Sequence, residues 1–353
     1  MLNPTSPDLL NLTWVQSVWP NIPLQEFVWE PVAVQGASSV VGRIHLVPEL
    51  PWRPFTAVIK FGHPNMPEWA YRSAYLAETL VYQHQLVPRK TLQLPRCCFA
   101  SCDAATRSFV LVLEEVAHAT GGTLHTSISS PSQMHRIIQT LAHWHATWWD
   151  RPIPEGPWEE TAKILLLNTT DAEEWAERVL PPLAERLGGD WLAMMATHRG
   201  QVAAAVKHWR KVLQEGPDLT LVHGDVHPGN LLFVDGQSDP VWVDWQCVTA
   251  LKGVYDLALL QGPNTDIAIR RQHERAWLAT YRETLAEDGI VYSEEVLRRD
   301  YSIALWFAGL RWLDLMFALG RNPTVDTRWI ETVVMRVATA FTDWNILQTV
   351  NVL

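Results

Sequence analysis

The residues best suited to chemistry lie within one short stretch, residues 221–246. Its polar residues of interest are His223, Asp225, Asn230 and Asp244. Transfer of a phosphoryl group from a nucleotide requires little covalent chemistry from a protein but much positioning. It needs a carboxylate that receives the proton of the acceptor hydroxyl, and oxygen ligands that hold Mg²⁺. Asp225 is therefore the predicted catalytic base, and Asn230 and Asp244 are the predicted metal ligands.

A hairpin is predicted to bring the second metal ligand back to the first. Residues 231–234 and 241–243 are apolar enough for two strands, and residues 235–240 between them are of turn-forming types. This hairpin places Asp244 beside Asn230, although they are fourteen residues apart in the sequence. The alternative is that these polar residues only cap a turn and end a strand.

Two charged residues upstream are expected to form a pair. Residues 55–61 have the pattern of a buried strand, with Lys60 near its end. A helix that begins at Pro67 and runs to about residue 86 places Glu78 among apolar and aromatic neighbours. A carboxylate in such surroundings is costly unless it is paired, so Lys60 and Glu78 are expected to contact each other. Solvated positions for both side chains are the alternative.

Other strands are predicted near these residues. Residues 27–46 predict two short strands around a turn of small residues that includes Ser38 and Ser39. The backbone N–H groups of such a turn could approach phosphate oxygens, whereas a plain hairpin turn is the alternative. Residues 108–116 form an unbroken apolar run, which suits a strand in a sheet that is covered on both faces.

The chain after this run is predicted to be mainly helical. Two acids end the run and glycines follow, so a boundary is expected between a lobe of residues 1–116 and a lobe of residues 117–353. Helical spacing and capping residues predict helices over residues 131–150, 171–187, 191–215, 266–287, 293–319 and 326–346. His143 and His145 lie two residues apart in the first of these, so they point to different faces and form no ligand pair.

The composition bounds the class of protein. The 353 residues carry a formal net charge of −10, which gives no electrostatic basis for general nucleic-acid binding. The four cysteines form no metal-clip spacing and no disulfide framework, which favours reduced thiols in an intracellular, cytoplasmic protein. We expect no membrane insertion, because there is no signal-peptide pattern and no run of about 18 apolar residues. These features leave the oligomeric state open.

Taken together, the motifs resemble the aminoglycoside phosphotransferase and choline kinase group, the small-molecule branch of the protein-kinase-like fold, and in particular its ecdysteroid-kinase-like members. The resemblance covers roughly residues 30 to 320. It is carried by residues 58–60, 77–82, 111–115, 141–146, 223–230 and 243–246. It implies an α+β fold of two lobes, in which a small N-terminal antiparallel sheet with one helix precedes a larger, mainly helical lobe.

The resemblance also implies a donor, a cofactor and an acceptor: ATP or another nucleoside triphosphate, Mg²⁺, and a hydroxyl group of a small molecule. By this likeness Lys60 would hold the α- and β-phosphates and pair with Glu78. Glu115 would belong to the hinge that meets the adenine through backbone groups. His223 would support the catalytic loop, and Asp256 would brace it, although Asp256 could also be the N-cap of a following helix.

Two other functions start from the same residues. His223, Asp225 and His227 could be ligands of a zinc-dependent hydrolase, because imidazole and carboxylate groups bind Zn²⁺ well. The residues between them break the His-x-His-x-Asp-His pattern that such enzymes need. A kinase-like binding protein without catalysis is the third reading, and it would be indicated by loss of the base or of a metal ligand. Neither is lost here.

The sequence says least about the acceptor. Acceptors of the resembled group range from cationic amino sugars to choline and steroid alcohols. The many Trp residues of the helical part favour an apolar or ring-bearing alcohol, with core packing of these Trp side chains as the alternative. A single glycine, Gly36, lies in the turn expected to cover the nucleotide, where many nucleotide-binding loops have more.

Overall fold

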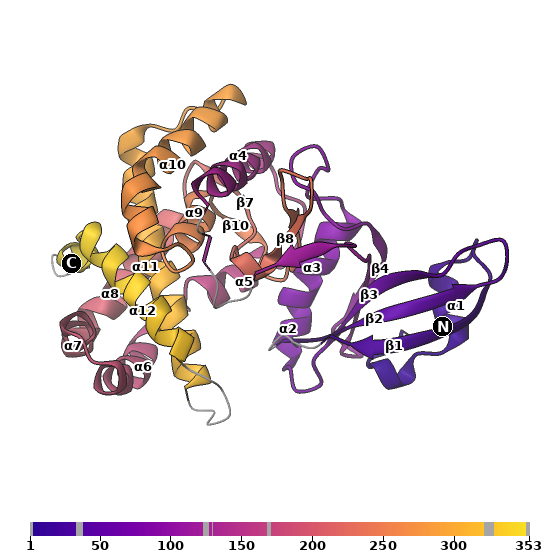
Figure 1. Cartoon of the computed structure of the whole chain (residues 1–353). Coiled ribbons are helices and arrows are strands. Elements are labelled where there is room, and N and C mark those ends of the chain that lie inside the picture. Colours follow the sequence, from indigo (N-terminus) through magenta and orange to yellow (C-terminus); the bar gives the residue numbers. More distant parts are fainter. Residues whose placement is uncertain are drawn as a thin grey trace.

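The computed structural model combines a sheet and a mainly helical part (Figure 1). It describes residues 3–32, 38–122, 127–128, 130–167, 171–320 and 328–350. A five-stranded antiparallel sheet forms the N-terminal part, and most helices follow it in the sequence and lie at the other end of the molecule. This mixture confirms the predicted α+β fold, whereas the lobe boundary near residue 116 stays a prediction.

The N-terminal sheet has the strand order β1-β2-β3-β5-β4. Its strands are β1 (Leu24–Pro31), β2 (Ser39–Pro48), β3 (Phe55–Gly62), β4 (Cys97–Asp103) and β5 (Ser108–Glu114). Ala57, Ile59 and Phe61 alternate along β3 and pack on one face of the sheet with Trp14. Phe109 of β5 packs on the opposite face. The sheet is thus covered on both faces, as the apolar run over residues 108–116 predicts.

Three helices cover this sheet, where the sequence predicted one. The short α1 (Leu12–Val18) was not predicted and contributes Trp14 and Val15 to the core on its side. On the other side, the helix expected from Pro67 to about residue 86 is two helices, α2 (Glu68–Arg72) and α3 (Ala74–Gln83). Ser73 breaks the helix because its backbone, at φ −123° and ψ −88°, leaves the helical region. Pro67 is the N-cap of α2 and not a residue of its first turn.

The C-terminal part contains the predicted helices with several corrections. Its helices are α4 (Pro131–Trp148), α5 (Trp158–Leu165), α6 (Ala172–Leu187), α7 (Asp190–Thr197), α8 (Arg199–Gln214), α9 (Val254–Gln261), α10 (Ile267–Glu287), α11 (Glu294–Leu319), α12 (Arg328–Asp343) and α13 (Ile346–Val350). The helix expected over 191–215 is broken at His198, and the last predicted helix ends before Asn345, whose φ is 52°. Helix α5 was not predicted, and a helix at the place of α9 entered only through the alternative that Asp256 is an N-cap.

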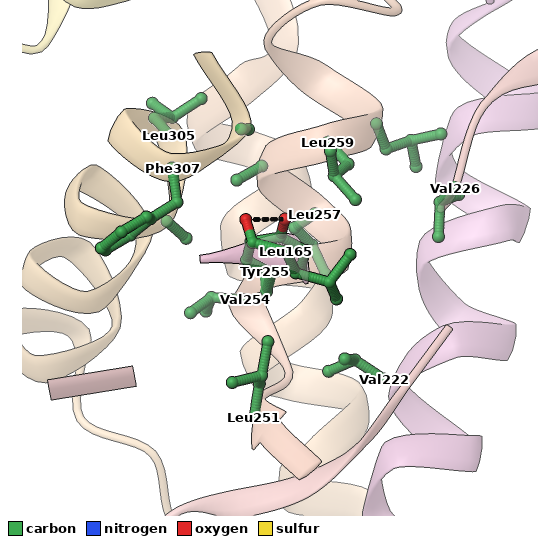
Figure 2. Close-up of a cluster of buried hydrophobic side chains, with 14 of the residues drawn as sticks. Leu165, Val222, Val226, Leu251, Val254, Tyr255, Leu257, Leu259, Leu305 and Phe307 are labelled. Carbon is green, nitrogen blue, oxygen red and sulfur yellow. Dashed lines mark hydrogen bonds between the residues drawn. The ribbon is translucent and has the colours of Figure 1, made fainter. Parts of the chain in front are cut away.

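Short strands lie within and around residues 221–246. β7 (Leu219–Val222) pairs antiparallel with β10 (Thr249–Lys252), and β8 (Leu231–Val234) lies between β6 (Ala119–Gly121) and β9 (Val241–Trp242). Figure 2 shows part of the apolar cluster in this region, including Val222 and Val226, which flank the candidate catalytic loop in the sequence. In the same cluster the Tyr255 hydroxyl donates to the carbonyl of Leu165 at 3.2 Å. The candidate catalytic loop is therefore flanked by well-packed apolar side chains.

Helix α11 bears on the expectation that the chain does not insert into a membrane. By length and composition it is the one helix within the described residues that could cross a bilayer. However, 61% of its apolar 18-residue window is buried inside the protein. Packing in the core therefore accounts for its apolar side chains.

Core packing also accounts for much of the Trp content. The buried Trp side chains of the helical part include Trp144, Trp149, Trp175, Trp209, Trp277, Trp306 and Trp312. They belong to one large hydrophobic cluster. The number of Trp residues is therefore no evidence for an aromatic pocket.

Candidate active site

The hairpin places the two predicted metal ligands side by side, as expected. Strands β8 and β9 pair in the register Leu231↔Trp242, and the backbone N–H of Val243 donates to the carbonyl of Asn230 at 3.1 Å. Asp244 follows directly, with φ at 64°. This left-handed backbone is uncommon for a residue other than Gly and turns the chain at the end of the hairpin. The local turn chemistry of the sequence thus determines this part of the site.

His223 ties the loop to the hairpin through one ring nitrogen and holds the loop itself through the other. Its Nε2 donates to the carbonyl of Val243 at 3.1 Å, and its Nδ1 accepts from the backbone N–H of Asp225 at 3.3 Å. Burial lowers the pKa of His223, so the neutral ring that these bonds require is favoured. A zinc hydrolase would need one of these nitrogens for the metal, and in His227 Nδ1 is likewise engaged, by the N–H of Gly229 at 3.0 Å. His223 therefore has the contacts of a support residue.

Asp256 braces the same loop from the first turn of α9. One carboxylate oxygen accepts from the backbone N–H of His223 at 2.8 Å, and the other accepts from that of Gly224 at 2.9 Å. His145 adds a third bond, from Nε2 at 3.2 Å. The alternative of an N-cap is wrong, because Gly253 is the N-cap and Asp256 lies within the helix. Asp256 is fully buried, and these three donors compensate for its lost hydration.

Asp225, the predicted base, is held by a residue that the sequence analysis did not identify. Nη2 of Arg311, on α11, donates to Oδ1 of Asp225 at 2.7 Å, while Nη1 donates to the carbonyl of Gly224. Burial alone would raise the pKa of Asp225, but the charge of Arg311, followed by that of His227, outweighs it and lowers the pKa. Gly224 has φ 75°, and a Cβ there would lie 2.3 Å from the carbonyl oxygen of Cys247. Only Gly fits at that position.

A signal for Arg311 was present in the sequence. Residues 303–310 are apolar or glycine, and Arg311 follows them within a helix that packs in the core. A charged side chain at such a position is costly without a partner of opposite charge. That partner, Asp225, lies 86 residues upstream, and the sequence alone offered no means to choose it.

Lys60 joins the sheet to the hairpin. Its Nζ donates to Oε2 of Glu78 at 2.7 Å and to Oδ1 of Asp244 at 2.9 Å. The expected contact between Lys60 and Glu78 is therefore confirmed, and Asp244 is a partner that was not expected. Burial alone would lower the pKa of Lys60, but the charges of Asp244 and Glu78 outweigh it and raise the pKa. Glu78 is buried, which raises its pKa, and its Oε1 accepts from the backbone N–H of Trp245 at 3.3 Å.

The remaining predicted contacts to the nucleotide lie at two places around the sheet. The hydroxyl of Ser38 donates to Oε1 of Gln246 at 2.9 Å, and Ser39 is buried at the start of β2. The bond from Ser38 connects the turn before β2 to the segment that follows Asp244. Glu115 follows β5 and accepts a bond from Nε of Arg43 at 2.6 Å through its side chain. Gly36 lies outside the described residues.

The donor set of Asn230 and Asp244 suits Mg²⁺. Nδ2 of Asn230 donates to the backbone carbonyl of Asp225 at 2.9 Å, which orients the amide and leaves its oxygen for a cation. Lys60 occupies Oδ1 of Asp244, so Oδ2 is the second oxygen. Mg²⁺ prefers oxygen ligands and is often bound by one or two protein groups together with substrate phosphates. The residues present therefore fit that ion.

Comparisons with known proteins bear on the family and the fold of the chain. Residues 110–287 match the model of a family described as the phosphotransferase enzyme family. No curated protein matches the sequence. Among solved structures, a putative aminoglycoside phosphotransferase from Ralstonia eutropha is similar, with a TM-score of 0.54, 13% identity, and 96% of this chain and 98% of that chain covered.

Two further structures share the fold at low identity. The ethanolamine kinase of Plasmodium vivax gives a TM-score of 0.52 at 13% identity, with 88% of this chain and 82% of that chain covered. A spectinomycin phosphotransferase in complex with ADP and spectinomycin gives 0.52 at 12% identity, with 95% and 99% covered. At these identities the similarity shows a common fold, that of small-molecule kinases.

Proposed function

Because the chain belongs to the phosphotransferase enzyme family, we propose that it transfers the γ-phosphate of ATP, or of another nucleoside triphosphate, to a hydroxyl group of a small molecule. The observation that carries the proposal is the position of Lys60, whose Nζ lies between Glu78 on α3 and Asp244 on the hairpin. This one ammonium group connects the predicted nucleotide-binding part to the predicted metal ligand. The base candidate Asp225 lies in the adjoining loop.

Lys60 is suited to hold the phosphates of the donor. An ammonium group has three N–H donors, and the two carboxylates use two of them. The third remains for a phosphate oxygen. Because Glu78 is buried and fixed by Trp245, it holds the ammonium in place before the nucleotide arrives. Ser38, Ser39 and the backbone near Glu115 are the further contacts that we assign to the nucleotide.

Asp225 is suited to receive the hydroxyl group of the acceptor. Arg311 occupies its Oδ1, and Nε2 of His227 lies 3.7 Å from its Oδ2. Oδ2 can therefore accept a hydrogen bond from an incoming hydroxyl. With its pKa lowered, Asp225 stays ionised and acts mainly by orienting that hydroxyl, which suits a loose transition state in which the proton leaves late.

Asn230 and Asp244 are the residues that would hold Mg²⁺. The ion would neutralise charge on the donor's phosphates. Asn230 is fixed by its bond to the carbonyl of Asp225, so the base and the metal ligand keep one geometry. His223 and Asp256 maintain that geometry by holding the loop to the hairpin and to α9.

A screen for acceptor-dependent release of ADP tests this function. The purified protein is incubated with ATP and Mg²⁺ and a panel of aliphatic, ring-bearing and aminoglycoside alcohols. We expect at least one alcohol to raise ADP release above the rate in water and to gain a phosphate that mass spectrometry detects. A panel with no phosphorylated product would contradict the proposal.

Replacing the base separates catalysis from binding. Asp225→Asn keeps the shape of the side chain but removes the charge that orients the hydroxyl, so we expect transfer to fall at least about 10²-fold. The affinity for ATP, measured by calorimetry, should change by less than about threefold, because Asp225 lies on the acceptor side. Asp235→Asn, at an exposed turn of the same hairpin, is the matched control and should keep full activity. Full activity of Asp225→Asn would rule out the role assigned to it.

A further inference from the structure

A hollow of about 720 Å³ lies between α8, α11 and α13, at one end of the β7–β10 pair. None of the described residues that line it belongs to residues 221–246. Lys252 of β10 lines the hollow and pairs with Leu219, the first residue of β7, whereas the candidate catalytic loop follows Val222 at the other end of that strand. At about 3.3 Å per residue, the two ends of β7 are about 10 Å apart. The hollow is therefore separate from the candidate active site.

The walls of the hollow are mainly apolar. They are formed by Trp209, Val212, Pro217, Val296, Ile303 and Ile346. Pockets that bind small molecules typically measure roughly 300–1,000 Å³ and combine apolar walls with a few polar groups that fix the orientation of the ligand. The hollow has the size and the walls of such a pocket.

One buried ammonium group, that of Lys252, reaches the hollow. The side chain is 5% exposed, and Nζ donates to Oδ2 of Asp300 at 2.8 Å. An ammonium group has three N–H donors, and this is the one hydrogen bond that the described residues accept from it. Buried donors without an acceptor are costly. We therefore expect an oxygen atom to bind Lys252 from within the hollow.

The gap between Lys252 and Asp218 suits a hydroxyl group. Nζ of Lys252 and Oδ2 of Asp218, which also lines the hollow, are 4.0 Å apart, too far for a direct hydrogen bond. One oxygen about 2.8 Å from both atoms would bridge them with an angle of about 90° at the oxygen. That oxygen must accept from the ammonium and donate to the carboxylate. A hydroxyl does both, whereas an ether or a carboxylate cannot donate.

The charges around this gap are balanced. Lys252 and Arg299 are cations that line the hollow, and buried Asp300 accepts hydrogen bonds from both. With Asp218, two cations face two carboxylates, so their charges sum to zero. Glu215 also lines the hollow, but it is exposed, so solvent screens its charge. A neutral head group is therefore matched better than an anion or a cation.

We propose that this hollow binds a neutral molecule with an apolar body and a hydroxyl group, the hydroxyl bridging Lys252 and Asp218 while the body packs on the apolar walls. The inference goes beyond the proposed transfer reaction and does not rest on it. Water can make the same two bonds as the hydroxyl. The experiment therefore has to show that the apolar body adds affinity.

Four probes of one shape test the inference. 3-Phenylpropan-1-ol, 3-phenylpropanoate, 3-phenylpropylamine and 3-phenylpropyl methyl ether share the same body and differ in the head group. Binding to the purified full chain is measured by ligand-observed NMR titration without nucleotide. We expect the alcohol to bind with a Kd of about 1–5 mM, as suits so small a ligand. It should bind at least about fivefold more tightly than each of the other three.

Variants assign the binding to the hollow. Val212→Trp fills it from α8 and should abolish binding of the alcohol. Asp218→Asn, tolerated at φ 70°, removes one negative charge, so the ratio of alcohol to 3-phenylpropanoate affinity should fall at least about fivefold. Lys252→Met should bring the alcohol and the ether to within about twofold, and if it does not fold, Asp218→Asn decides. Lys207→Met, an exposed lysine of α8 paired with Glu173, is the control and should change nothing. Circular dichroism checks that each variant is folded.

Each contrary result would overturn the inference. No binding of the alcohol up to about 20 mM would show that the hollow takes water only. Binding that survives Val212→Trp would place the alcohol elsewhere, such as at the candidate active site. Equal affinities for the alcohol and the ether would exclude the hydroxyl bridge. None of these results bears on phosphate transfer, which the screen for ADP release tests separately.

Discussion

Two clusters, each of one buried cation and two acids, lie in different parts of the fold. The first joins Lys60 to Glu78 and Asp244. The second, in the helical tail, joins Arg270 on α10 to Glu274 and to Asp343 at the end of α12. Lys60 is 9% exposed and Arg270 is fully buried, so desolvation of the cation alone does not tell the clusters apart.

The clusters differ in how many of their hydrogen-bond donors and acceptors remain available to a ligand. In the tail, Glu274 also accepts from the Tyr301 hydroxyl at 2.7 Å and from Nε1 of Trp344 at 2.9 Å. Asp343 also accepts two bonds from Arg271. Both tail carboxylates are therefore supplied with donors from within the fold.

In the first cluster, groups remain for a ligand. Lys60 keeps one N–H donor and Asp244 keeps one oxygen, and the side chain of Asp244 is 32% exposed. A buried charge thus does not by itself mark a functional site. A functional site is marked by donors and acceptors that have no partner within the fold and can be reached by a ligand. Each prediction below tests that distinction.

The largest expected effect is on stability, in the tail. Arg270→Met removes the cation from two carboxylates and leaves Glu274 buried beside its neutral donors only, which should cost about 3–5 kcal/mol of unfolding free energy. Urea denaturation measures this loss. Transfer per folded molecule should stay within about threefold of wild type, because no residue of the cluster touches the candidate site.

An exposed neighbour provides the control for this variant. Arg271 bonds the same Asp343, but its side chain is 54% exposed. Arg271→Met should therefore cost less than about 1 kcal/mol. Equal losses in the two variants, or a folded Arg270→Met protein without activity, would break the distinction between the clusters.

The next effect is on catalysis, in the first cluster. Lys60→Met removes the ammonium that we assign to the phosphates, and loss of one such charge contact typically lowers kcat about 10²–10³-fold. The fold should suffer less than in Arg270→Met, because Glu78, whose pKa burial already raises, can take up a proton. Steady-state kinetics and calorimetric affinity for ATP measure the effect.

A second buried lysine is the matched control for Lys60. Lys252 is 4% exposed and donates to Asp300 at 2.8 Å. Asp300 also accepts from the hydroxyl of Tyr292 at 2.8 Å, so this cluster resembles the one in the tail. Lys252→Met should lower stability and keep most of the activity per folded molecule. Similar kinetic losses in both lysine variants would contradict the role in phosphate binding that we assign to Lys60.

The parts of the site that the sequence predicted correctly are contacts between local elements. The hairpin that joins Asn230 and Asp244 is local, and turn residues determine it, so it was found. The contact of Lys60 with Glu78 followed from one strand and one helix, because a buried carboxylate there needs a partner. The roles assigned to these residues remain predictions.

Contacts between distant segments could not be read from the sequence. Arg311 meets Asp225 only because α11 packs behind the loop, and Asp343 meets Arg270 across 73 residues. Helical periodicity predicts which face of a helix is buried but not which helix it meets. The break at Ser73 was missed for a related reason, since both flanking segments pack on the sheet and no Pro or Gly marks the break.

The smallest expected effect is the response of the tail cluster to acid. Burial alone would raise the pKa of Asp343, but the bonds from Arg271 and Arg270 and their charges outweigh it and lower the pKa. A carboxyl whose pKa is lower in the folded than in the unfolded chain adds stability above its unfolded value, about 3.9. That stability is lost as the pH falls through the folded pKa.

Asp343→Asn should therefore be less stable than wild type at pH 7, and the difference should shrink toward pH 3. Urea titrations at several pH values measure it, and Glu78→Gln is the counterpart, because a raised pKa predicts the opposite trend for the charge of Glu78. A stability difference for Asp343→Asn that does not change with pH would show that shape, and not charge, holds the end of α12.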